Sequence, residues 1–308
     1  MGRGARRPKG FRDVDGILLL DKPCGISSNK ALQKVRYLFK ANKAGHTGSL
    51  DPLATGMLPI CFGEATKFST YLLDASKSYR AVCQLGQTST TGDAEGEITL
   101  QQAVNVTRQE VEEILKRFVG LIDQKPPMHS AIKVNGQRLY KLARKGETIE
   151  RQSRSIEIYS LELINLNENM LTIDVHCSKG TYIRTLAEDI GEQLGCGAFL
   201  AKLKRTGVHP FWDQPCVAMT ELQSLADSSP HSLDALLLPV EAALSGLPRV
   251  IIEGAEARAI QQGQVIQADS SQPPGLIILI NHEDQFIGIG EASNDGRISP
   301  KRLMNTAR

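Results

Sequence analysis

The chain contains two segments in which apolar and polar residues alternate, residues 156–165 and 170–177, and only a short asparagine-containing turn separates them. Alternation with a period of two is typical of strands that bury one face, so the two segments are predicted to pair as a hairpin. Residues 79–85 alternate in the same way, and the apolar run 16–20 indicates a buried strand. A chain with these strands is expected to build its core on a mostly antiparallel sheet.

Three other segments have the spacing of helices. In residues 28–40 apolar side chains recur at intervals of three and four, and residues 107–118 and 185–194 follow the same rule. Thr107 and Glu110 are placed to form a capping box at the start of the second segment. Short strands mixed with separate helices predict a fold of the α+β class.

The character of the sequence changes after Pro248. Short apolar strands separated by glycine, proline and aspartate follow, at residues 249–252, 276–280 and 286–289. This pattern is typical of a small β-rich domain, partly barrel-like. Residues 224–247 are predicted to form a connecting helical region. With 308 residues the chain is long enough for two domains, which we place at 13–248 and 249–308, after a basic arm at 1–12.

Composition argues against several classes of protein. The sequence has no run of about 18 apolar residues, so a membrane-spanning helix is not predicted. Six cysteines occur without a C-x-x-C pair or a histidine cluster. Their pattern argues against a zinc site and indicates a reduced protein of the cytosol.

Charge is unevenly distributed along the chain. The net charge is only +2, but basic residues gather in four stretches, at 3–12, 30–43, 133–154 and 202–205. Any one stretch is most simply explained as a solvated surface, whereas the distribution as a whole suits a phosphate backbone. The basic arm at 1–12 is explained equally well as an RNA-contacting segment or as a solvated tail.

The loop GHTGSLDPLATG, at residues 45–56, holds a single carboxylate, Asp51, between glycines. Glycine permits unusual backbone angles and close approach, and Pro52 pushes Asp51 toward an extended conformation. A stiff, isolated carboxylate suits a covalent nucleophile that attacks an electrophilic carbon. On spacing alone, Asp51 is more simply explained as an Asx-turn or helix N-cap residue. His46 in the same loop is a candidate general base, or a wedge beside an extruded base.

Four further side chains are candidates for the same site. Tyr79 stands at the start of a predicted strand, where it could stack on a base, relay a proton or pack in the core. Alternation over residues 180–184 places Tyr182 and Arg184 on one face of a predicted strand. An arginine beside a catalytic carboxylate would lower the pKa of that group and hold it ionised, while the simpler role is a surface ion pair. Leu203 has the composition of a core residue.

Five blocks of sequence stand in a fixed order: LLLDKPCGISSNKAL (18–32), GHTGSLDPLATGMLPICFGEATK (45–67), KSYRAVCQLGQTSTTGDAEGE (77–97), PPMHSAIKVNGQRLYKLARKGE (126–147) and CSKGTYIRTLAEDIGEQLGCGAFLAKLKRTGVHPF (177–211). They resemble the ordered motifs of the bacterial tRNA pseudouridine synthase B family. Ser27, Phe199 and Lys204 depart from the family's common Thr, His and Arg, which affects fine contacts with RNA rather than the chemistry. The chain is identified as a member of that family.

The resemblance implies a pseudouridine synthase fold with a small C-terminal domain of PUA type that binds RNA. It implies an isomerase that converts uridine 55 in the T loop of tRNA into pseudouridine. The N1–C1′ glycosidic bond breaks and the base rejoins the sugar through C5, so no cofactor and no metal are expected. The expected partner is the T-stem loop of tRNA, not DNA or a membrane, and the expected state is a cytoplasmic monomer.

The resemblance also assigns roles to residues. Asp51 is the catalytic residue, and attack on C6, attack on C1′ and removal of a C2′ proton all stay open as its action. Six residues are expected to bind or frame the substrate: His46 beside the flipped nucleotide, Tyr79 against the target ring, Tyr182 and Leu203 in the pocket wall, Arg184 paired with Asp51, and Lys22 in support of the Asp51 loop. Residues 124–152, rich in lysine and arginine, correspond to a thumb-like insertion that orders on tRNA.

A second hypothesis comes from another class of protein. A tRNA-binding folding factor, in which catalysis is secondary, would share the basic stretches and the C-terminal domain. The two hypotheses differ in whether the protein needs Asp51.

Overall fold

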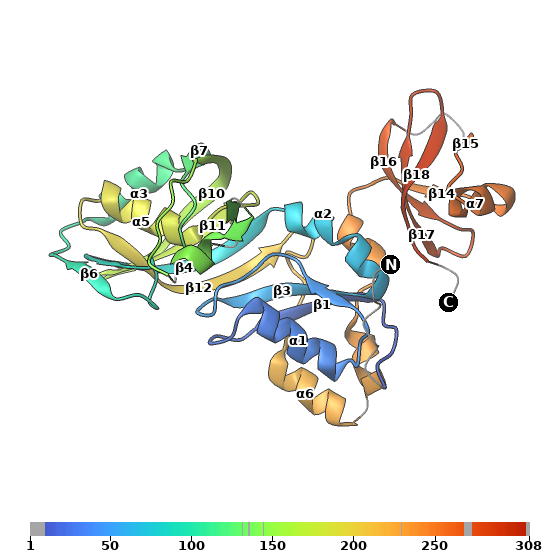
Figure 1. Ribbon diagram of the computed structural model, residues 1–308. Coiled ribbons are helices and arrows are strands. Elements are labelled where there is room, and N and C mark those ends of the chain that lie inside the picture. The colour runs from blue at the N-terminus through green and yellow to red at the C-terminus, as the bar shows by residue number, and fades with distance from the viewer. Residues whose placement is uncertain are drawn as a thin grey trace.

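The computed structural model describes residues 10–130, 132–134, 136–143, 145–228, 230–267 and 273–305. Within these residues the largest sheet has nine strands in the order β13-β1-β3-β12-β4-β11-β10-β7, with β2 paired to β3 (Figure 1). Its strands are β1 (Gly16–Lys22), β2 (Ala44–His46), β3 (Thr55–Phe62), β4 (Lys77–Leu85), β7 (Gly120–Gln124), β10 (Arg154–Asn167), β11 (Met170–Cys177), β12 (Ala198–Val208) and β13 (Val217–Ala218). All pairs are antiparallel except β1 with β13 and β3 with β12, so the predicted α+β class and mostly antiparallel sheet are confirmed.

The hairpin predicted from alternation is formed by β10 and β11, which pair from Ile158 opposite Cys177 to Asn167 opposite Met170. Alternation in β4 has the expected cause, because Tyr79 is buried against the core while its neighbour Arg80 is exposed. These strands bury one face only.

Strand β1 begins with an apolar run, residues 16–20, because both of its faces are covered. Leu18 and Leu20 pack in the same core as α1, whereas Ile17 and Leu19 pack on the opposite face with α2 (Ser69–Asp74). A strand covered on both sides cannot alternate, and so it appears in the sequence as a continuous apolar run.

Four helices pack into the core on one face of the sheet: α1 (Ser28–Leu38), α3 (Arg108–Arg117), α5 (Ile183–Gln193) and α6 (Met219–Ser228). The Ser27 side chain accepts a hydrogen bond from the Lys30 N–H at the start of α1. Thr107 and Glu110 form the predicted capping box of α3. These helix starts were therefore predictable from local sequence.

The strand predicted over residues 180–184 is wrong. Helix α5 begins at Ile183, Tyr182 is its N-cap residue and Arg184 lies in its first turn. Gly180 has a φ of +82°, which turns the chain, and the Gln124 side chain bonds both the N–H and the carbonyl of Tyr182. Five residues of apparent alternation cannot outweigh the apolar stripe of α5, which repeats at intervals of three and four.

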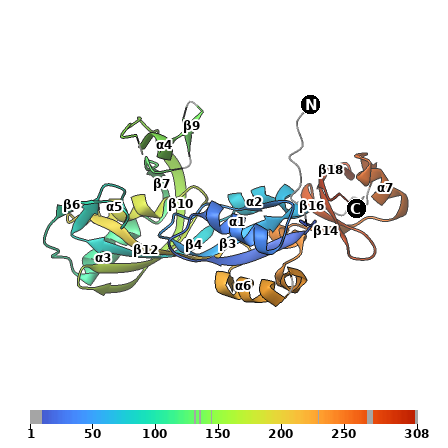
Figure 2. The same cartoon turned by 60° about the horizontal axis from the view of Figure 1, so that its bottom comes forward.

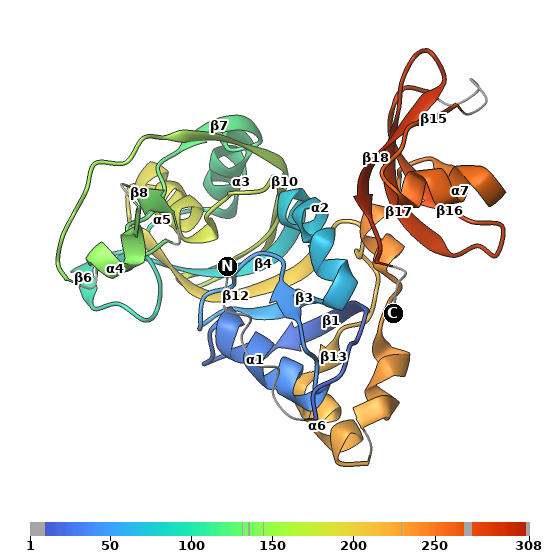
Figure 3. The same ribbon diagram turned by 45° about the vertical axis from the view of Figure 1, so that its right-hand side comes forward.

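A second sheet of five strands lies in the order β14-β16-β17-β18-β15 within the described residues. Its elements are β14 (Arg249–Ile251), α7 (Gly254–Gln261), β15 (Ile266–Gln267), β16 (Gly275–Ile280), β17 (Phe286–Ala292) and β18 (Arg297–Leu303). Figure 3 shows it beside α2, where the rings of Phe68 and Phe286 meet edge to face at 5.2 Å. The division of the chain at 248/249 stays a prediction, which the start of β14 at Arg249 supports.

The segment predicted as a thumb contains β8 (Lys133–Val134), β9 (Gln137–Arg138) and α4 (Leu139–Ala143). Figure 2 shows α4 and β9 projecting away from the sheet, at the end of β7 and β10. Arg144 of this segment, and residues 1–9 of the basic arm, lie outside the described residues.

The remaining elements are short: the 3₁₀ turns Gly63–Lys67, Pro230–Leu236 and Val240–Leu244, and the strands β5 (Gln87–Ser89) and β6 (Ile98–Gln101). Among the helices that the structure describes, none is long and apolar enough to cross a bilayer.

Candidate active site

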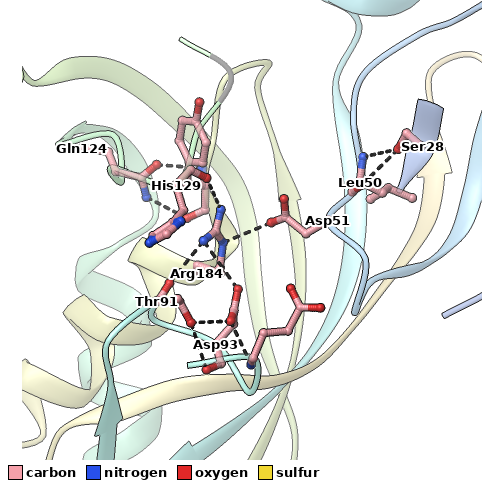
Figure 4. A network of polar contacts seen from close by, with 10 residues as sticks. Ser28, Leu50, Asp51, Thr91, Asp93, Gln124, His129 and Arg184 are labelled. Carbon is pink, nitrogen blue, oxygen red and sulfur yellow. Dashed lines mark hydrogen bonds and ion pairs between the residues drawn. The ribbon is translucent and has the colours of Figure 1, made fainter. Parts of the chain in front are cut away.

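The loop that carries Asp51 is held in place by hydrogen bonds to its backbone groups. It connects β2 to β3, and the Ser28 hydroxyl accepts from the Leu50 N–H at 2.7 Å and donates to the Leu50 carbonyl at 3.0 Å (Figure 4). The Gly25 N–H donates to the Pro52 carbonyl at 2.8 Å. The chain continues through a short turn into β3, so no helix begins at Asp51 and the N-cap interpretation is excluded.

Asp51 forms an ion pair with Arg184, as the sequence predicts. The distance from Arg184 Nε to Asp51 Oδ2 is 3.1 Å, and the arginine side chain is only 6% exposed against 42% for the aspartate. Arg184 also donates to the carbonyls of His129 at 2.7 Å and Thr91 at 3.2 Å. The Arg184 guanidinium is therefore held in place by two carbonyls, while the Asp51 carboxylate stays accessible.

Arg184 has a second acidic neighbour, Asp93, at 3.4 Å from Nη1. The Asp93 side chain is 3% exposed and accepts from the Thr91 hydroxyl and the Glu95 N–H. One guanidinium thus bridges a buried carboxylate and an accessible one (Figure 4). No local pattern marks Asp93 as a site residue, because it lies in a Thr-, Asp- and Gly-rich stretch typical of any loop.

The Arg184 charge lowers the pKa of Asp51, as expected, but it does not decide the net direction of the shift. Burial raises the pKa of Asp51 above its ordinary value, the Arg184 charge opposes that rise, and the Asp93 charge adds to it. The arginine's attraction is real, but desolvation outweighs it. A carboxylate with a raised pKa is more basic than one in water.

Asp51 stands between two hollows. The smaller, of about 310 Å³, is lined by Tyr79, Tyr182 and Leu203 together with Asp51 and Arg184. The larger, of about 680 Å³, is also lined by Asp51 and Arg184. The three residues predicted to frame the substrate ring thus line one hollow beside Asp51.

His46 lines the larger hollow. Within the described part of the chain its buried Nδ1 has no hydrogen-bond partner. Burial lowers the pKa of His46, and the nearby Arg205 charge lowers it further. The lowered pKa favours the neutral imidazole on the wall of the larger hollow.

Lys22 is fully buried behind the loop. Its ammonium donates to the carbonyls of Pro23 at 2.9 Å, Ile26 at 2.7 Å and Pro52 at 3.4 Å. These bonds fasten the residue after Asp51, which agrees with the supporting role expected for Lys22.

Arg205 lies at this site, although it belongs to the basic stretch 202–205, which predicts a solvated surface. Arg205 is 1% exposed, whereas Lys202 and Lys204 are exposed. It donates from Nε to the Met57 carbonyl at 2.6 Å and from Nη2 to the Gly48 carbonyl at 3.3 Å. Its alternation with Lys204 in β12 was the one available signal that it points inward.

Among the described residues no group of three or more His, Cys, Asp or Glu side chains is arranged to hold a metal ion. The polar groups that converge on Asp51 are those of an acid–base or nucleophilic site.

Solved structures of two assemblies contain a chain with the same fold. A chain in the crystal structure of a Cbf5-Nop10-Gar1 complex matches with a TM-score of 0.72 at 23% identity, over 98% of this chain and 92% of that one. A chain in the structure of an H/ACA RNP bound to a substrate RNA containing 2'-deoxyuridine matches with a TM-score of 0.73 at 23% identity, over 95% and 86%. Such identities show the fold alone.

Family models cover most of the sequence. The model of the TruB family pseudouridylate synthase N-terminal domain matches residues 36–183, which include Asp51, Tyr79 and Tyr182. The tRNA pseudouridylate synthase B C-terminal domain matches 184–245, and the C-terminal model of pseudouridine synthase II TruB matches 248–304. Fold and site together define the class of the pseudouridine synthases.

The relatives make this class more specific. Proteins named tRNA pseudouridine synthase B from Ectopseudomonas mendocina (strain ymp) and Pseudomonas putida (strain GB-1) are 54% and 53% identical over 296 residues. In both comparisons 96% of this chain and 97% of the relative are covered. The chain belongs to the tRNA pseudouridine synthase B family, a family of isomerases, as its motifs predicted.

Proposed function

We propose that the protein isomerises uridine 55 in the T loop of tRNA to pseudouridine, with Asp51 as its catalytic residue. The observation that carries this proposal is the position of Asp51, accessible between two hollows and paired at 3.1 Å with the buried Arg184. The relatives' name, tRNA pseudouridine synthase B, supplies the substrate class.

The reaction is balanced within one nucleotide. The N1–C1′ bond breaks, a C5–C1′ bond forms, the proton leaves C5, and N1 ends as an N–H. Asp51 supplies the nucleophile or base, and Arg184 holds its carboxylate in one orientation. Partial removal from water makes the carboxylate more basic, which suits either action.

The two hollows have different tasks in this proposal. The smaller hollow takes the uracil ring, with Tyr79, Tyr182 and Leu203 around it and Tyr79 near the C5 proton. The larger hollow takes the nucleotide or the gap beside it, where the neutral His46 packs in place of the extruded base.

Recognition of the tRNA T-stem loop is assigned to the thumb-like insertion and to the C-terminal sheet. The insertion over residues 124–152 offers lysines and Tyr140, which lines the larger hollow. The five-stranded sheet at the C-terminal end is proposed as a PUA-type RNA-binding domain. We further propose that the protein acts as a cytoplasmic monomer on RNA and not on DNA.

Mapping pseudouridine in an unmodified tRNA transcript treated with the purified protein tests the proposal. We expect modification at position 55 and at no other uridine. A transcript without pseudouridine, or with pseudouridine only outside the T loop, would contradict it. Release of free uracil would indicate a hydrolase instead.

The folding-factor hypothesis is separated by a variant. Asp51→Asn is expected to bind tRNA with unchanged affinity and to form no pseudouridine. If that variant still brings misfolded tRNA to its native state as well as wild type, the two activities are independent. Asp74→Asn, which removes an exposed carboxylate paired with Lys179, is the matched control.

A further inference from the structure

Arg205 is a buried cation that the proposed reaction does not use. Its side chain is 1% exposed and lines the smaller hollow together with Asp51 and Tyr79. Among the described residues no carboxylate lies within ion-pair distance of it, in contrast to Arg184 with two. A buried arginine without a balancing charge is costly, so its retention at this place points to a task.

The hydrogen bonds of Arg205 lead to both ends of the catalytic loop. Gly48 stands three residues before Asp51 and Met57 six residues after it, and Arg205 donates to the carbonyl of each. The guanidinium therefore links the two ends of the loop. Ser28 and Lys22 hold the loop between them, by hydrogen bonds at Leu50 and Pro52.

The third partner of Arg205 is Tyr79. The two residues are opposite each other in the antiparallel pair of β12 and β4, and both point into the core face. Both side chains also line the smaller hollow, so Arg205 and Tyr79 are neighbours there as well. One side chain thus bonds the loop of Asp51 and lies next to Tyr79.

The backbone fixes Arg205 in this place. Strand β12 pairs in parallel with β3 at Arg205 opposite Gly56, so Arg205 lies where the two halves of the sheet join. Gly56 has a φ of +95°, and a Cβ there would collide with the Arg205 carbonyl oxygen. Such a close approach leaves little freedom for the guanidinium to move relative to the loop.

We propose that Arg205 is a positioning residue, which holds the Tyr79 hydroxyl at a fixed place relative to the Asp51 carboxylate and stabilises the ionised form of that hydroxyl, which then takes the proton from C5. This rests on the proposed function. Before the step the Tyr79 hydroxyl gives its own proton to water. In the step the C5–H bond breaks, its electron pair restores the ring double bond, and the proton passes to the ionised Tyr79 oxygen.

Electrostatics agree with the geometry. Burial raises the pKa of Tyr79, and the charge of Arg205 opposes that rise. The other groups that act on the phenol are Cys177 on β11 and Asp51 in the loop, and both raise its pKa. Arg205 is therefore the group among these that favours the ionised phenol.

The kinetic test uses Arg205→Met and Arg205→Lys under single turnover, with tritium release from C5-labelled tRNA as the readout. We expect Arg205→Met to slow the chemical step by about tenfold to hundredfold while tRNA binding is unchanged. Arg205→Lys keeps the charge and is expected to recover part of the rate. Arg80→Met and Arg80→Lys, on the exposed face of β4, are matched controls.

A double-mutant cycle with Tyr79→Phe decides whether Arg205 acts through the hydroxyl. In the Tyr79→Phe background the loss caused by Arg205→Lys or Arg205→Met is expected to shrink, because the hydroxyl that Arg205 holds is absent. Equal fold-losses in both backgrounds, or a loss confined to tRNA binding, would overturn the proposal.

A measurement without turnover separates this proposal from the proposed function. With tyrosine labelled at the ring carbon that bears the hydroxyl, NMR follows ionisation of Tyr79, assigned by its absence in Tyr79→Phe. The titration is expected to move to higher pH in Arg205→Met and to stay closer to wild type in Arg205→Lys. An unchanged titration would overturn the proposal, even if uridine 55 is modified. If wild type forms no pseudouridine, the proposed function fails and this titration still decides the role of Arg205.

Discussion

The loop of Asp51 is held from two sides by buried arginines whose partners differ. On one side Arg184 contacts two carboxylates and two carbonyls, so its charge is balanced. On the other side Arg205 donates to two carbonyls and lies opposite Tyr79 in the neighbouring strand, and no described carboxylate balances it. The first arginine therefore orients the catalytic group, whereas the charge of the second acts on its neighbours.

The effect of the unbalanced charge is visible in two other side chains on the Arg205 side. The pKa of His46 is lowered by burial, which is the larger cause, and by the Arg205 charge. The same two causes, in the same order, lower the pKa of Lys77 to about 8. On the Arg184 side the pKa of Asp51 is raised by burial and by the Asp93 charge, and the Arg184 charge opposes that rise. The charge of Arg184 is thus offset by its acidic neighbours, whereas the charge of Arg205 is felt by the side chains around it.

The largest effect on stability is expected from Arg184→Met. Its loss would leave Asp93 buried without a cation, and breaking a buried pair costs about 3–5 kcal/mol. Asp51 would lose its orienting partner, so we expect turnover to fall by about a thousandfold as well. Urea unfolding and single-turnover assays measure the two effects. Arg80→Met, at an exposed ion pair, is the control and is expected to cost less than about 1 kcal/mol.

Gly56→Ala tests the close approach on the Arg205 side. A Cβ at this position would meet the Arg205 carbonyl in addition to the strain of a positive φ, so we expect a loss of about 2–4 kcal/mol in the free energy of unfolding. Gly25→Ala has a φ of +82° but open space around it, and should cost only about 1 kcal/mol. Equal losses of unfolding free energy in both variants would show that β3 and β12 are not crowded where Gly56 lies opposite Arg205.

Lys77→Met tests the excess of positive charge on the Arg205 side. The pKa of Lys77 is lowered from 10.5 to about 8, so between these pH values the unfolded chain binds the proton and the folded chain does not. Stability of wild type relative to Lys77→Met should therefore rise with pH across this window, by up to about 3 kcal/mol. Urea unfolding of both proteins at several pH values checks the slope, and a flat difference would contradict it.

The smallest expected effect is that of Asp93→Asn on the Arg184 side. The Asp93 charge contributes to the raised pKa of Asp51, so its removal should move the acid limb of the pH–rate profile to lower pH. Because Arg184 keeps its bonds to two carbonyls, we expect the rate at neutral pH to fall by only about tenfold. A limb that moves to higher pH would show that Asp93 acts on Asp51 only through Arg184.

Local patterns were sufficient for much of this molecule. The hairpin of β10 and β11 and the capping box of α3 depend on residues close in sequence. The structure brings Tyr79 and Arg184 to a hollow that Asp51 also lines, although Arg184 lies in a helix and not in the predicted strand.

Other features depend on contacts between distant residues and could not be predicted in this way. Asp93 belongs to the site because Arg184, 91 residues later, folds back to it, and Arg205 is buried because β3 and β4 both pair with β12. The net pKa shift of Asp51 depends on burial, which no local pattern reports.

The most direct test of the account is the rate of tritium release from C5-labelled uridine in tRNA by Asp51→Asn, with Asp74→Asn measured beside it. The account predicts that Asp51→Asn binds tRNA as wild type does and releases no tritium above background, while Asp74→Asn turns over normally. Turnover by Asp51→Asn at a rate near that of wild type would contradict the central role of Asp51.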